Sequence, residues 1–312
     1  MCTAIYYKNR YFGRNLDYER SFGEEVVTMS KGFSYPMGGR NMETKYAVIG
    51  MAHMEDDIPL FYDGMNEKGL AMAGLLFEEN AVYQKPASGK DNIPSWAFIP
   101  WILGRCKNMS EAEELLENLN LTDLPFSEDL PPSPLHWMIA DRERCIVVEA
   151  MADGLHVYEN PVGVLTNNPP FPFHLQNLHQ YLNLTAEEPK DRFSASLSLR
   201  PFSRGMGAIG LPGDWSSPSR FVRAAFVLSN SVSEEEEHII QFFHILGAVE
   251  QVQGCVRLKS GYEKTIYSCC CDLEMGVYHW KTYGDYRIWK VELAGEMLYK
   301  NGLHRLQIFK VI

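Results

Sequence analysis

Alternating and clustered apolar residues divide the chain into blocks of strands and blocks of helices. The first block, TAIYYKNRYFGRN (3–15), predicts a β-hairpin that turns near Lys8 and Asn9. Further strands are predicted where apolar runs are bounded by Gly, Pro or tight-turn pairs such as Asp-Gly. These runs are AVIGMAHM (47–54), PLFYDGMN (59–66), GLAMAGLLF (69–77) and LHWMIADRERCIVVEAMADGLHVYEN (135–160).

Helical patterns occupy the middle of the chain. In SEAEELLENL (110–119), Ser110 and Glu113 fit a capping box, in which each side chain bonds the backbone N–H of the other residue. In DWSSPSRFVRAAFVLSN (214–230), Ser217 fits the N-cap and Pro218 the first helical position. The other predicted helices are 95–106, 174–184 and 233–246, the last with Glu residues that favour a helix N-terminus.

The tail 265–293 returns to the strand pattern, and this alternation of blocks favours one α+β layered domain over residues 1–312. The tail contains three adjacent cysteines, which alternate between the two faces of a strand. Structural zinc sites favour paired C-x-x-C motifs. We therefore expect no metal and interpret Cys269, Cys270 and Cys271 as small core residues.

The charge balance restricts the partners of the protein. The chain has 29 Lys and Arg against 40 Asp and Glu, a formal net charge of −11. Nucleic acids and anionic membranes bind basic surfaces, so this charge argues against either of them as a partner. No run of about 18 apolar residues predicts a membrane span, and no basic and apolar leader predicts secretion. We expect a cytoplasmic protein whose seven cysteines are free thiols.

Cys2 has the most distinctive chemistry, because it directly follows the initiator methionine. Met1 is normally removed before a small residue, which leaves a thiol and a free α-amine in one residue. The α-amine has an ordinary pKa of about 7.7–8.0, so it can act as a base at neutral pH. A nucleophile activated by its own N-terminal amine is an established route to covalent catalysis. The residues alone leave a catalytic thiol and an incidental one both open.

The register of the first hairpin decides which charged residue lies beside Cys2. With a two-residue turn, Asp17 lies diagonally from Cys2 on the same face, where it would orient the amine. With a three-residue turn, Tyr7 pairs with Tyr11, and Arg14 reaches the Cys2 face, where it would lower the pKa of the thiol. The sequence leaves both registers open.

Four motifs together resemble the choloylglycine hydrolase family, which contains bile salt hydrolases and penicillin V acylases. They are MCTA…FGRNLD, YDGMNEKGLAMAGLLF, VLTNNPPFPFHLQNL and GLPGDWSSPSRFVRAAFV, and the likeness runs from Cys2 to about Leu228. The family consists of N-terminal nucleophile (Ntn) hydrolases. The resemblance therefore implies a four-layer αββα fold and hydrolysis of a C–N amide bond without a metal or organic cofactor. It also implies a homo-oligomer, often a tetramer.

The resemblance also implies the catalytic residues. Cys2 matches the nucleophile, and Arg14 and Asp17 match the charged pair beside it. Asn167 matches an asparagine whose side chain donates to the oxyanion, and Arg220 matches an arginine that completes the site.

Leu76 is a departure from the family pattern. Bile salt hydrolases usually have A-G-L-N-F where this chain has A-G-L-L-F, and penicillin V acylases usually have Tyr at this position. In the family, the position contributes a backbone N–H to the oxyanion hole. A backbone donor survives a change of side chain, so we expect activity to persist and selectivity to differ.

A steroid substrate requires an apolar, partly aromatic pocket. Ordinary core or loop packing is the alternative role for each candidate wall residue. The candidates are apolar or aromatic side chains near the motifs and in the loop 127–135; they are Tyr18, Phe22, Phe61, Leu130 and Leu135.

The leading hypothesis is a bile salt hydrolase that releases glycine or taurine from conjugated bile acids through a thioester on Cys2. The alternative is a penicillin V acylase or another N-acyl amidase. A hypothesis of a different class is an inactive bile-acid-binding protein with the same fold. The presence of Arg14, Asp17 and Asn167 beside Cys2 argues against this third hypothesis. Interception of the thioester by an amine would give an acyltransferase reaction.

Overall fold

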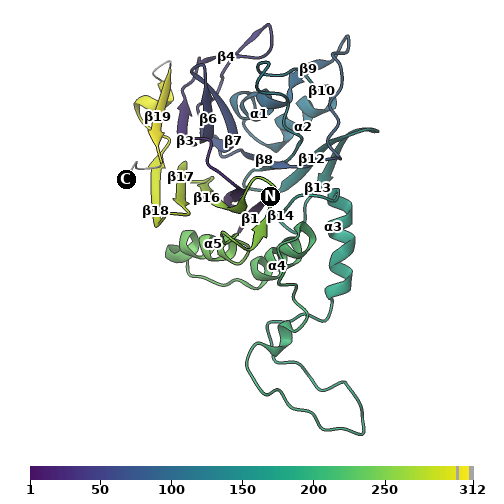
Figure 1. Cartoon of the computed structure of the whole chain (residues 1–312). Helices are drawn as coiled ribbons and strands as arrows, with labels where there is room; N and C mark the ends of the chain where they lie inside the picture. The colour runs from purple at the N-terminus through teal and green to yellow at the C-terminus, as the bar shows by residue number, and fades with distance from the viewer. Residues whose placement is uncertain (300–301, 309–312) are drawn as a thin grey trace.

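The computed structural model describes residues 1–299 and 302–308. In this part of the chain, two large β-sheets stack face to face and helices cover both outer surfaces, so the layers follow the order αββα (Figure 1). This is the predicted fold. None of the described helices combines the length and the apolar character needed to cross a membrane.

The first sheet contains both the N-terminal hairpin and the C-terminal strands, in the order β14-β1-β2-β16-β17-β18, with β15 paired to β16. Its strands are β1 (Cys2–Tyr7), β2 (Tyr11–Tyr18), β14 (Val164–Leu165), β15 (Val256–Arg257), β16 (Tyr262–Asp272), β17 (Val277–Thr282) and β18 (Asp285–Glu292).

The second sheet has the order β13-β12-β11-β8-β7-β6-β3-β19. Its strands are β3 (Glu25–Met29), β6 (Val48–Glu55), β7 (Ile58–Asn66), β8 (Ala71–Leu76), β11 (Leu135–Ala140), β12 (Cys145–Met151), β13 (Gly154–Glu159) and β19 (Leu303–Gln307). Short pairs lie outside it; they are β4 (Ser34–Pro36) with β5 (Asn41–Glu43), and β9 (Asp91–Pro94) with β10 (Leu119–Thr122).

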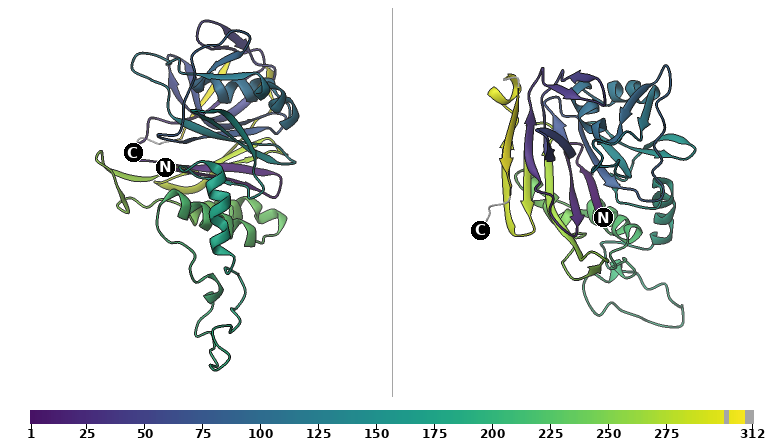
Figure 2. Two further views of the ribbon diagram at one scale, coloured as in Figure 1. Left: turned by 90° about the vertical axis from the view of Figure 1, so that its right-hand side faces the viewer. Right: turned by 45° about the horizontal axis from the view of Figure 1, so that its top comes forward.

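Helices α1 and α2 cover the second sheet, and α4 and α5 cover the first (Figures 1 and 2). The segment between η2 and α4 projects as a long loop beyond the α4–α5 layer (Figure 2). The helices are α1 (Phe98–Arg105), α2 (Met109–Glu117), α3 (Phe171–Asn177), α4 (Ser217–Asn230), α5 (His238–Gly247) and α6 (Glu296–Tyr299). Short 3-10 turns are η1 (Ser95–Ala97), η2 (Leu178–Tyr181), η3 (Met206–Ala208) and η4 (Glu235–Glu237).

The hairpin of β1 and β2 has the three-residue turn, because Tyr7 pairs with Tyr11. Side chains alternate between the faces of a strand. Arg14 therefore lies on the same face as Cys2, and Asp17 points to the opposite face. The two-residue alternative is wrong.

The predicted capping box of α2 is wrong by two residues. The N-cap is Asn108, whose side chain accepts the N–H of Glu111 at 3.1 Å. The Glu111 carboxylate in turn accepts the N–H of Lys107 at 2.9 Å. The reciprocal bonding is thus present, but it uses Asn108 and Glu111 in place of Ser110 and Glu113, because asparagine is an equally good N-cap.

The predicted N-cap of α4 is also displaced, because Ser216 and not Ser217 takes that position. The Ser217 hydroxyl donates to Oγ1 of Thr166 at 2.9 Å and accepts the N–H of Asn167 at 2.8 Å. The first residue of the helix therefore anchors the loop that carries Asn167.

Among the described residues, buried apolar side chains form two clusters. One lies between the sheets and under α4 and α5, and it includes Phe12, Met65 and Phe221. The other lies between the second sheet and helices α1 and α2, and it includes Phe98 and Trp101. The prediction for the cysteine triplet is confirmed; Cys269, Cys270 and Cys271 are fully buried in β16.

Candidate active site

The site forms where strands β7 and β8 separate, between the two sheets. Their ladder ends at the pair Asp63–Ala73. Just beyond this pair, the guanidinium of Arg14 enters from the first sheet and donates to the carbonyl oxygens of Tyr62 (3.3 Å) and Gly74. Arg14 is fully buried, so these carbonyls fix its position at the opening of the ladder.

Arg14 lies directly against the Cys2 thiol. Its Nη2 is 2.5 Å from Sγ of Cys2, which is itself buried at the first position of β1. Burial lowers the pKa of Arg14. The interactions of Arg14 with Cys2 and Asp63 raise the pKa by more than burial lowers it, so the pKa lies above its ordinary value. The fixed guanidinium is placed to donate a charge-assisted hydrogen bond to the sulfur.

The N-terminus lies in the same polar environment. The N–H of Cys2 donates to Oδ1 of Asn167 at 2.8 Å. The α-amino group of Met1 donates to the carbonyl of Asp17 at 2.8 Å and to the carboxylate of Glu263. Burial lowers the pKa of this ammonium, whereas the carboxylate of Asp17 opposes the shift.

Asp17 lies on the far face of the sheet from the thiol and is fully buried. Its Oδ1 accepts the hydroxyl of Thr265 at 2.6 Å, and its Oδ2 has no hydrogen-bond partner within the described chain. Burial raises the pKa of Asp17, and the N-terminal ammonium and Arg220 act against this rise. The carboxylate therefore lies away from the thiol, and its negative charge raises the pKa of the Met1 ammonium, against the lowering by burial.

Arg220 and Asn167 complete the cluster. Arg220 donates through Nη1 to the carbonyl of Cys2 and to Oγ1 of Thr3, both at 2.6 Å, and through Nη2 to Oδ1 of Asn167 at 2.7 Å. The amide nitrogen of Asn167 donates to the carbonyl of Leu76 at 2.7 Å. A side-chain amide has two N–H groups, so Asn167 retains a second donor.

The ladder geometry also determines where the N–H of Leu76 points. The next residue, Phe77, donates its N–H to the carbonyl of Pro134 at 2.8 Å, toward β11. N–H groups alternate in direction along an antiparallel ladder, so that of Leu76 points away from β11. This is the edge of β8 at which the Gly74 carbonyl meets Arg14.

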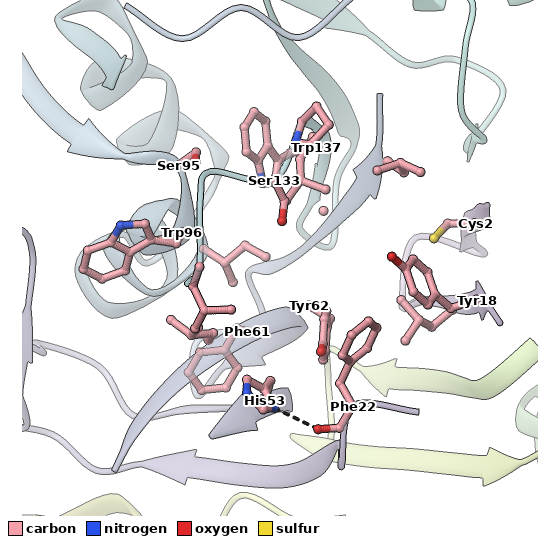
Figure 3. A pocket seen from close by; sticks show the side chains of 18 of the residues that line it. Cys2, Tyr18, Phe22, His53, Phe61, Tyr62, Ser95, Trp96, Ser133 and Trp137 are labelled. Carbon is pink, nitrogen blue, oxygen red and sulfur yellow. Dashed lines mark hydrogen bonds between the residues drawn. The ribbon is translucent and has the colours of Figure 1, made fainter. Parts of the chain in front are cut away.

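A cavity of about 400 Å³ opens beside Cys2. Figure 3 shows the Cys2 sulfur at one end of this cavity and Trp96 at the other. Its lining includes all of the predicted wall residues, which are Tyr18, Phe22, Phe61, Leu130 and Leu135.

Several residues of the candidate site were missed by the sequence reasoning. Trp96, Ile99 and Phe126 also line the cavity, and the aromatic content of 95–106 was the available signal. Glu263 contacts the ammonium of Met1, and Thr265 contacts the carboxylate of Asp17, only through the pairing of β16 with β2, for which the sequence gives no local signal. Within residues 1–299 and 302–308, no group of three His, Cys, Asp or Glu side chains is arranged to hold a metal ion.

The αββα layers, with Cys2 at the start of the first strand, define an Ntn-hydrolase fold. A family model for linear amide C–N hydrolases of the choloylglycine hydrolase family matches residues 2–306. The chain belongs to this family.

Relatives cover almost the entire chain. It is 48% identical over 306 residues to the bile salt hydrolase/transferase of Lactiplantibacillus plantarum, covering 96% of this chain and 94% of the relative. A crystal structure of a cysteine-to-alanine variant of the conjugated bile acid hydrolase of Clostridium perfringens is 36% identical, with a TM-score of 0.91 and coverage of 99% and 97%. The penicillin V acylase of Agrobacterium tumefaciens, 18% identical with a TM-score of 0.76 and coverage of 98% and 91%, shares the fold.

Proposed function

We propose that this chain hydrolyses the amide bond of glycine- or taurine-conjugated bile acids through Cys2, after removal of Met1. The observation that carries this proposal is the Arg14 guanidinium against the Cys2 thiol, at one end of an apolar cavity of about 400 Å³. The relatives that span the chain are named as bile salt hydrolases, which supports the choice of substrate.

In the acylation half-reaction, the Cys2 thiol passes its proton to the α-amine, and Arg14 stabilises the resulting thiolate. The thiolate attacks the amide carbonyl carbon. The second N–H of Asn167 and the N–H of Leu76 hold the oxyanion. The α-ammonium then protonates the leaving nitrogen, the C–N bond breaks, and glycine or taurine departs from a thioester on Cys2.

In the deacylation half-reaction, the α-amine takes a proton from water, which attacks the thioester carbonyl. The same donors hold the second oxyanion, and collapse expels the thiolate and releases the bile acid. Asp17 orients the amine from the opposite face of the sheet, and Arg220 holds the carbonyl of Cys2. An amine that replaces water in this step would give the acyltransferase reaction.

The five predicted wall residues form the surface on which the steroid packs in this proposal. Penicillin V hydrolysis is the second candidate activity, because Leu76 at the cavity matches neither the asparagine nor the tyrosine of the family. We also propose that the chain acts in the cytoplasm as a single catalytic domain.

A homo-oligomer, with a tetramer as the expected form, is supported by the projecting loop between η2 and α4 (Figure 2). Phe193 and Phe202 on this loop are 79% and 89% exposed, and large exposed apolar side chains are typical of interfaces. Light scattering of the purified protein tests this expectation, and a monomeric mass would contradict it.

The activity test is incubation with glycocholate, taurocholate and penicillin V, followed by quantification of the released amine product. Cys2→Ser is the matched control, because a hydroxyl is far less acidic than a thiol. We expect bile salt hydrolysis by the wild-type protein and a loss of at least about a thousandfold in Cys2→Ser. Hydrolysis of penicillin V alone would support the second candidate, and comparable turnover by Cys2→Ser would exclude Cys2 as the nucleophile.

A further inference from the structure

One buried pair of side chains, His136 and Glu149, contacts the segments on both sides of the candidate oxyanion hole. His136 lies on β11 and Glu149 on the neighbouring β12. Both residues are fully buried, and Nδ1 of His136 is 2.9 Å from Oε1 of Glu149. The mechanism above assigns no role to this pair.

On one side, the pair holds the loop that carries Asn167. Nε2 of His136 lies 2.9 Å from the carbonyl oxygen of Thr166, the residue before Asn167. Both carboxylate oxygens of Glu149 accept the N–H of Phe171, at 3.0 and 3.2 Å. The pair therefore fixes both ends of the segment 166–171.

On the other side, the ring of His136 holds the end of β8. It stacks on the ring of Phe77, with the centroids 4.3 Å apart and the planes 6° from parallel. Phe77 directly follows Leu76, whose carbonyl accepts the side-chain N–H of Asn167. One imidazole thus contacts both the carbonyl of Thr166, which precedes Asn167, and the ring of Phe77, which follows Leu76.

The hydrogen-bond partners of His136 also determine the orientation of its imidazole ring. The Thr166 carbonyl can only accept, so Nε2 of His136 carries a hydrogen. The Glu149 carboxylate lies at Nδ1. A carboxylate behind a histidine sets its tautomer and its orientation.

We propose that His136, oriented by Glu149, is a positioning residue that sets the spacing of the two oxyanion donors, the Asn167 side chain and the Leu76 N–H. The inference rests on the proposed function. Displacement of a catalytic group by about 1 Å costs up to about a hundredfold in rate. Loss of the Thr166 contact should therefore lower kcat and leave substrate binding intact.

Two amide substitutions at His136 separate this role from simple packing. The nitrogen of Gln reaches the place of Nε2 and retains the bond to Thr166, whereas that of Asn reaches only the place of Nδ1 and retains the bond to Glu149. We expect His136→Asn to lower kcat for glycocholate by about 10- to 100-fold with KM within about twofold. His136→Gln also loses the stacking on Phe77 but keeps the bond to Thr166, so we expect its kcat to exceed that of His136→Asn by about tenfold. An equal loss in both variants, or a loss in neither, would overturn the proposal.

Two affinities and one reaction rate distinguish the positioning role from a general loss of structure. The C24 aldehyde of cholic acid forms a thiohemiacetal with Cys2 and needs the oxyanion hole, whereas free cholate needs only the cavity. In His136→Asn, affinity for the aldehyde should fall in parallel with kcat, while affinity for cholate and the rate of Cys2 alkylation by iodoacetamide stay within about twofold. Weakening of all three readouts would contradict a positioning role.

Glu149→Gln carries the test if His136→Asn does not fold. Its amide can donate to Nδ1 of His136 while its oxygen accepts the N–H of Phe171, so every bond persists in a neutral pair. We expect a kcat within about threefold of wild type, and a loss above tenfold at unchanged Tm would overturn the proposal. A wild-type protein without bile salt hydrolysis would contradict the proposed function, whereas an active wild type with an unaltered His136→Asn variant would contradict the positioning role alone.

Discussion

The two helical layers cover their sheets with different chemistry. Helix α1 packs on the second sheet through Phe98 and Trp101, which are fully buried, and Phe98 meets Trp137 edge to face at 4.9 Å. Helix α4 packs on the first sheet and inserts the fully buried Arg220 between Cys2 and Asn167. One layer is built mainly from apolar contacts, and the other includes charged groups that converge on the N-terminus.

The apolar contacts of α1 and the buried charge of α4 have different energetic effects. Burial of an aromatic side chain stabilises a fold through the hydrophobic effect, whereas a buried guanidinium must first lose its hydration. Burial accordingly lowers the pKa of Arg220. Its hydrogen bonds to Cys2 and Asn167 offset part of this cost and hold these two residues together. We therefore expect substitutions of α1 side chains that lie outside the cavity to affect unfolding, and substitution of Arg220 in α4 to affect turnover.

The largest expected effect is on stability, from Trp101→Ala under α1. Truncation of a fully buried large aromatic side chain costs about 3–5 kcal/mol in the free energy of unfolding. Urea denaturation measures this loss. Hydrolysis per folded molecule should stay within about twofold of wild type, because Trp101 is not among the residues that line the cavity. A selective fall in kcat at full folding would contradict the separation.

Asn167→Ala should have the next largest effect, this time on turnover. Removal of one oxyanion donor costs about 10²–10³ in kcat, and we expect KM for glycocholate to change far less. Steady-state kinetics at a temperature well below the Tm of the variant measure both constants. If an increase in KM accounts for the entire loss in kcat/KM, Asn167 serves substrate binding.

Leu76 substitutions should tune selectivity and retain activity. Leu76→Asn should shift the ratio of kcat/KM between glycocholate and taurocholate by up to about tenfold, the value of about one hydrogen bond. Leu76→Tyr should shift activity toward penicillin V. If the ratios of kcat/KM between substrates stay within about twofold of wild type in both variants, the Leu76 side chain does not determine selectivity.

Asp17→Asn should move the pH profile. The α-amine must be unprotonated to accept the thiol proton, so kcat/KM rises with pH through the pKa of this amine. Burial lowers the pKa of the ammonium at Met1, whereas the negative charge of Asp17 raises it, and we expect the same effect of Asp17 on the Cys2 α-amine that removal of Met1 exposes. Asp17→Asn should therefore move the midpoint of the acid limb about one pH unit lower. An unchanged or higher midpoint in the variant would contradict this role.

Local patterns were sufficient to predict most strands, but the register of the first hairpin was not predictable from them. Lys8 and Asn9 both adopt a φ of 51°, and this turn geometry, together with the pairing of Tyr7 with Tyr11, places Arg14 beside Cys2. Either turn length is compatible with the same alternation of apolar residues. The motif resemblance supplied the candidate catalytic residues that the alternation of apolar and polar residues alone left open.

The polar partners of the site were not predictable, because they come from distant strands. Glu263 reaches the N-terminus only because β16 pairs with β2. His136 and Glu149 occupy positions in β11 and β12 that local patterns assign to ordinary sheet residues. Their role depends on contacts with Thr166 and Phe77, which the sequence pattern does not specify.

The most direct test of the central claim is intact-protein mass spectrometry of the purified enzyme before and after a rapid acid quench with glycocholate. We predict a chain that begins at Cys2, and a quenched species heavier by one cholyl group that is absent from Cys2→Ala. A fully active enzyme that retains Met1, or a cholyl adduct that persists in Cys2→Ala, would contradict an N-terminal cysteine nucleophile.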